Sequence, residues 1–134
     1  MKEGIPHDVQ RVFDTHDRDI RKKLLAVRRM ILDVAAETAG VGELEETLKW
    51  GQISYLTPKS KSGTTIRIDG PDEGASDLRL YVHCQTSLVD TMRSMYGDLL
   101  EYEGTRCVRY DARDAKQTEA VRHFIWMALT YHQG

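Results

Sequence analysis

The chain has 134 residues, of which 40% are hydrophobic and 30% charged, values typical of a single globular domain spanning 1–134. Its formal net charge of −2 gives no support to nucleic-acid binding, which usually requires a basic excess. The two cysteines, Cys84 and Cys107, are too few for a disulfide framework.

The sequence shows no signal of secretion or of membrane insertion. Residues 1–8 lack the apolar run of a signal peptide. No stretch approaches the ~18 apolar residues of a membrane span. We therefore expect a cytoplasmic protein that binds neither a membrane nor nucleic acid.

The first third of the sequence predicts two helices. Pro6 suits the start of the first helix, because proline fits the first turn. The second is expected between Asp17 and Gly40. Its apolar side chains recur at helical spacing: Ile20, Leu24, Val27, Ile31 and Val34. This stripe predicts a helix that is well buried on one side.

The middle of the sequence predicts strands over 44–50, 53–57, 64–69 and 77–84. In the last two, apolar and polar residues alternate, which is typical of an antiparallel sheet with one covered face. The glycine- and proline-containing segment 70–76 between them predicts a hairpin loop.

The last third predicts a short helix, a hairpin and a final helix. Ser87 and Asp90 form an approximate capping box for a helix that ends at Gly97. Two short strands are expected on either side of Gly104, and Asp114 is expected to cap the final helix. The overall order predicts an α+β fold. We expect a twisted, mainly antiparallel sheet of about five to six strands, with helices packed on one face.

Several segments resemble the signature of the YdhG-like family, whose members are domains of unknown function. These are LKWGQISYLT at 48–57, LYVHCQTSLVDT at 80–91, YGD at 96–98 and EYEG at 101–104. The family usually has proline where this chain has Ile53. The resemblance implies a compact α+β fold comparable to that of frataxin-like iron chaperones. It implies no catalytic residues.

An acidic stretch is the first candidate site. Residues 30–48 contain five acids and no base: Asp33, Glu37, Glu43, Glu45 and Glu46. They follow a basic segment, an order opposite to the one that the helix dipole favours. Such carboxylates could bind a hard cation or weakly bound iron, the role that the frataxin-like resemblance implies. The alternative is a solvated charged face, on which Arg29 pairs with Asp33.

The outer face of the central hairpin is the second candidate site. Its members are Trp50, Tyr55, Arg67, Arg79, Tyr81 and His83. Trp50 and Tyr55 are expected to form the walls of this site. In one register Arg67 lies opposite Arg79, a like-charge pair that an anionic ligand or partner would relieve. Alternatively, Asp69 and Asp77 lie diagonally across and neutralise both arginines, or a slip of two residues places Arg67 opposite Asp77.

An enzyme is the least supported class of function. His83 and Cys84 are neighbours on a predicted strand, with Cys84 on the apolar side, so the histidine cannot activate the thiol. The sequence therefore predicts a non-enzymatic binding domain, a monomer or weak homodimer. We expect it to bind iron weakly through the five carboxylates. The alternative is that it binds a small anionic ligand or a protein partner through the sheet face.

Overall fold

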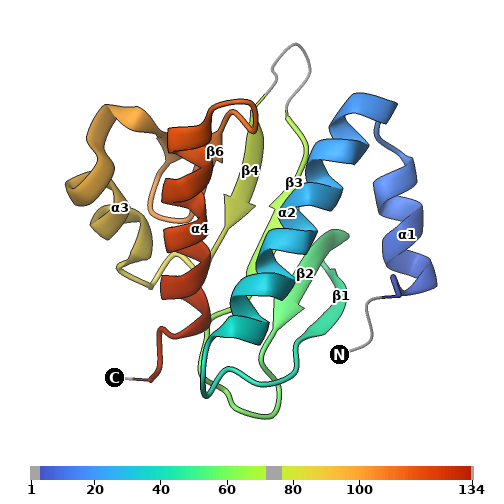
Figure 1. The fold of residues 1–134 in the computed structure, drawn as a ribbon, viewed down its shortest axis with the longest axis horizontal. Coiled ribbons are helices and arrows are strands. Elements are labelled where there is room, and N and C mark those ends of the chain that lie inside the picture. The colour runs from blue at the N-terminus through green and yellow to red at the C-terminus, as the bar shows by residue number, and fades with distance from the viewer. Residues whose placement is uncertain (1–3, 72–76, 134) are drawn as a thin grey trace.

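The computed structural model describes residues 4–71 and 77–133 (Figure 1). Its elements, in chain order, are α1 (His7–Asp14), α2 (Arg18–Glu37), β1 (Glu45–Lys49), β2 (Gln52–Leu56), β3 (Ile66–Asp69), β4 (Leu78–Tyr81), α3 (Leu88–Tyr96), a 3-10 turn (Gly97–Leu99), β5 (Glu101–Glu103), β6 (Cys107–Tyr110) and α4 (Ala115–Leu129). The strands form one antiparallel sheet in the order β1-β2-β3-β4-β6-β5. The predicted α+β fold is thus confirmed.

The helices cover one face of the sheet. Figure 1 shows α2 and α4 side by side across that face, with α1 next to α2 and α3 next to α4. Cross-strand partners share a face, and one such row runs Ile53, Ile68, Leu80 and Val108. All four are buried in the core beneath the helices. No helix within the described ranges is long and apolar enough to cross a membrane.

Local signals place the helix starts. The side chain of Asp17 accepts a hydrogen bond from the Ile20 N–H at the start of α2, and that of Asp114 accepts one from the Gln117 N–H at the start of α4. Ser87 precedes α3 but makes no capping bond with its side chain, so the predicted capping box is wrong.

The end of β4 differs from the prediction. β4 ends at Tyr81, and the chain then turns, with the Thr86 N–H donating to the His83 carbonyl at 3.0 Å. Cys84 lies in this turn and is exposed, so the prediction that it faces the core is wrong. Residues 72–76 of the predicted hairpin loop lie outside the described residues.

Candidate functional site

Two of the sequence-predicted site residues, Glu46 and Tyr55, lie beneath the helices and not on the surface. Glu46 is buried on the helix-covered face of β1, where Arg28 of α2 donates to its carboxylate at 2.7 and 3.0 Å. The Tyr55 hydroxyl donates to the same carboxylate at 2.7 Å. Glu46 is therefore committed to a buried ion pair, and Tyr55 cannot wall a site on the other face.

The other four predicted carboxylates lie apart from this pair. Asp33 is bonded to Arg29 at 2.9 Å, as in the solvated-face alternative. Glu43 lies 3.6 Å from Lys59, and Glu37 and Glu45 are exposed. Over residues 4–71 and 77–133, no three His, Cys, Asp or Glu side chains are grouped so as to hold a metal ion.

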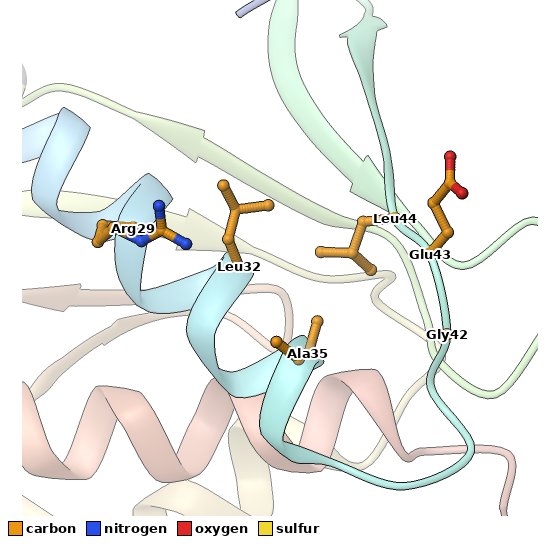
Figure 2. Close-up of a pocket in the computed structure, with 7 residues that line it drawn as sticks. Arg29, Leu32, Ala35, Gly42, Glu43 and Leu44 are labelled. Atoms are coloured by element: carbon orange, nitrogen blue, oxygen red, sulfur yellow. The ribbon is translucent and has the colours of Figure 1, made fainter. Parts of the chain in front are cut away.

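A hollow of about 220 Å³ lies between the end of α2 and the segment that leads into β1 (Figure 2). Its apolar walls include Leu32 and Leu44, whose side chains point toward each other in Figure 2, whereas the carboxylate of Glu43 points away from them. Arg29 also lines it but is engaged by Asp33. This hollow therefore offers neither a cluster of metal ligands nor an uncommitted cation.

The register of the open face differs from each alternative drawn from the sequence. Arg67 lies opposite Tyr81, and Asp69 lies opposite Arg79. On its other side Arg79 lies opposite Arg109 of β6, so like charges do meet, but between a different pair. Each of these two arginines forms ion pairs. Arg79 lies 3.2 Å from the carboxylate of Asp69, and Arg109 contacts the carboxylates of Glu101 and Glu103 on β5. This row of the face is neutralised internally.

Arg67 has no acidic residue directly opposite it on either neighbouring strand. Its cross-strand neighbours are Ser54 and Tyr81. The guanidinium carbon lies 5.0 Å from the ring centroid of Trp50 and 5.8 Å from that of Tyr81, so aromatic rings flank the cation. Within the described part of the chain the Arg67 side chain makes no hydrogen bond. Its Nε is buried without a partner, while the terminal nitrogens remain accessible.

A cavity of about 340 Å³ adjoins this guanidinium. Its lining residues are Lys49, Trp50, Leu56, Thr64, Thr65, Arg67 and His83. The charged members are cations and no carboxylate is among them, so the cavity favours an anion. The Gln85 N–H donates to Nδ1 of His83 at 3.1 Å, which leaves the proton of the neutral ring on Nε2 as a donor.

Tyr81 lies next to Arg67 and Cys107 lies one strand further along the same row, and neither adds negative charge. Burial raises the pKa of Tyr81 to about 12 and that of Cys107 to about 12. Cys107 lies opposite Tyr81 in the sheet. At neutral pH the phenol and the thiol both stay protonated and carry no charge.

Three of the six residues predicted for this face line the cavity, namely Trp50, Arg67 and His83. Tyr81 flanks Arg67, whereas Arg79 belongs to the neutralised row. The sequence analysis missed four lining residues: Lys49, Leu56, Thr64 and Thr65. Strand alternation gave a usable signal for Thr65, which it places on the same face as Arg67.

Trp50 occupies an unusual backbone conformation. Trp50 and Gly51 form the two-residue turn between β1 and β2, with φ of +52° and +75°. Turns of this kind require positive φ at both positions and favour Asn-Gly, because other side chains are strained there. Trp50 is 85% exposed, so burial in the core does not offset this strain. A strained and exposed aromatic residue beside an unpaired cation is typical of a functional position.

We expect the Trp50→Asn variant to be more stable than the parent protein by about 1 kcal/mol, because asparagine tolerates the left-handed region better than tryptophan. Urea denaturation measures the difference. Lys61 has a φ of +53° and gives a matched control, since Lys61→Asn should be stabilising for the same reason. A Trp50→Asn variant less stable than the parent would show that the indole is needed for folding.

The chain was compared with protein-family models, curated protein sequences and solved structures, and none of them matches it. The resemblance to the YdhG-like family remains a prediction.

Proposed function

We propose that the protein is a non-enzymatic binding domain that takes a small organic anion on the open face of its sheet, with Arg67 as the anchor. The observation that carries this proposal is an unpaired guanidinium next to a cavity whose lining contains no carboxylate. A ligand carboxylate or phosphate in the cavity would form charge-assisted hydrogen bonds with the terminal nitrogens of this side chain, which bond to no group of the described chain.

The other two arginines of the face support this interpretation by contrast. Arg79 and Arg109 lie on neighbouring strands and are both neutralised by carboxylates of the chain. The Nε of Arg109 is also buried without a hydrogen bond, but it lies 3.6 Å from the Glu103 carboxylate. Arg67 has aromatic neighbours in place of acids. Aromatic rings hold a guanidinium in position without neutralising its charge, so its hydrogen-bonding capacity remains available.

The iron-binding hypothesis gains no comparable support. Glu46, which lies at the end of the acidic stretch, is held by Arg28 and Tyr55 beneath the helices. Asp33 and Glu43 each face a cation of the chain. Weak iron binding through the exposed acids therefore remains a prediction, which a titration with ferrous iron would test.

Anion binding is tested by titrating the protein with benzoate and with phenyl phosphate while following backbone amide shifts. We expect saturable shifts centred on Lys49, Thr65, Arg67 and His83. Arg67→Gln should weaken binding at least tenfold, because hydrogen bonds to charged groups contribute about 1.5–3 kcal/mol.

Arg109→Gln is the matched control, since it removes a guanidinium from the same face but from the neutralised row. Its affinity should stay within about twofold of the parent value. Shifts spread over the whole surface, or equal weakening by both variants, would show that the anion responds only to general charge.

A further inference from the structure

We infer that the ligand of this site is a small aromatic carboxylate whose ring stacks on Trp50. This inference rests on the proposed anion binding and specifies the chemistry of both ends of the ligand. Arg67 determines the charged head group of the ligand, and Trp50 in its turn determines the shape of the rest of the ligand.

The position of Arg67 favours a flat head group. Its guanidinium carbon lies over the ring of Trp50, and Tyr81 flanks it as well. A carboxylate bound by two parallel N–H groups lies in the plane of the guanidinium. In an aromatic carboxylate the ring is conjugated with this group and tends to share that plane, and Trp50 is the exposed aromatic surface beside the guanidinium. A tetrahedral phosphate imposes no such alignment on the ring that it carries.

The exposure of Trp50 supplies the stacking surface. Trp50 is 85% exposed, and among the described residues only Arg67 contacts its ring as a cation. The strained turn at φ +52° keeps the indole at the rim of the cavity, where it contributes little to the core. Aromatic pairs gain about 0.5–1.5 kcal/mol beyond the free energy that comes from burying their surface. Stacking of a flat ligand would therefore explain why an exposed tryptophan is placed here.

The remaining walls fit a body of one or two rings. The cavity of about 340 Å³ is near the lower end of the range for small-molecule sites. Leu56 provides an apolar wall, and the hydroxyls of Thr64 and Thr65 can donate to a carboxylate oxygen. Lys49 adds a second cation at the end of β1.

Calorimetric titration with benzoate and with cyclohexanecarboxylate tests this inference, because the two ligands share the head group and the carbon number but only benzoate is flat. We expect benzoate to bind about three- to tenfold more tightly, the range that aromatic stacking gives. The preference should disappear in Trp50→Asn and persist in Lys61→Asn, which changes a second strained residue outside the cavity lining.

The outcomes separate this inference from the function on which it rests. Equal affinity for benzoate and cyclohexanecarboxylate, with binding still lost in Arg67→Gln, would overturn the inference of an aromatic ligand and leave the proposed anion binding intact. Tighter binding of phenyl phosphate than of benzoate would overturn the carboxylate head group. Failure of all three ligands to bind would overturn both proposals.

Discussion

The Glu46→Ala variant is expected to lose about 3–5 kcal/mol of folding free energy, the cost of leaving a buried charge without its partner. Arg28 is 7% exposed and donates two hydrogen bonds to the Glu46 carboxylate. The Tyr55 hydroxyl would also lose its acceptor. Burial and the Glu46 carboxylate raise the pKa of Tyr55, so the phenol is protonated and acts as the donor at neutral pH. Urea denaturation followed by circular dichroism measures the loss.

A paired replacement separates the loss of the charge partner from the loss of packing. Arg28→Met combined with Glu46→Leu removes both charges and keeps much of the apolar volume, so it should recover most of the stability lost in Glu46→Ala. Tyr55→Phe should cost less, about 1–3 kcal/mol, because one hydrogen bond is removed and the ion pair remains. A loss below 1 kcal/mol in Glu46→Ala would show that Arg28 can reach water without its partner.

The fold could be predicted from the sequence because its signals are local. The apolar stripe of α2 and the alternation through β3 and β4 each depend on residues a few positions apart. The helix cap at Asp114 is equally short-range. The pairing of β4 with β6 joins segments separated by a helix and a further strand, and no local pattern encodes it.

The candidate site could be predicted only in part, because it depends on register. Shifting β4 along β3 by two residues at a time places Asp77, Arg79 or Tyr81 opposite Arg67, and the structure has Tyr81 there. All three registers keep the same side chains on each face, so the alternation of apolar and polar residues cannot distinguish them. Alternation also fails in β2, where Ile53, Ser54 and Tyr55 are all buried. Tyr55 therefore could not be assigned to a face from the sequence, although its pairing with Glu46 places it beneath the helices.

The Trp50–Gly51 turn escaped prediction for a different reason. A tight hairpin is normally recognised by Asn or Gly at its first position, and tryptophan does not provide that signal. Local propensity and structure disagree at this position, which also lines the cavity beside Arg67. Such disagreements are expected where a residue is kept for binding and not for folding.

The Gly63→Ala variant is expected to lose about 3 kcal/mol of folding free energy, because the added methyl group overpacks a contact between backbones. A Cβ at this position would lie 2.7 Å from the Ala128 carbonyl oxygen and 2.7 Å from the Leu129 Cα. Both belong to the end of α4 and cannot rotate away as a flexible side chain would. Gly4→Ala is the matched control, since a Cβ there meets nothing within 4 Å and the stability should hardly change.

The close approach at Gly63 is fixed by hydrogen bonds on both sides of it. The Thr64 N–H donates to the Ala128 carbonyl at 2.9 Å, and the Ser62 hydroxyl donates to the Leu129 carbonyl at 2.8 Å. These carbonyls lie at the end of α4, where the helix itself supplies no donors. Displacing the segment would break both bonds and shift Thr64 at the cavity, so Gly63→Ala should weaken benzoate binding as well as folding. A variant with full stability and full affinity would show that the end of α4 can move to admit the methyl group.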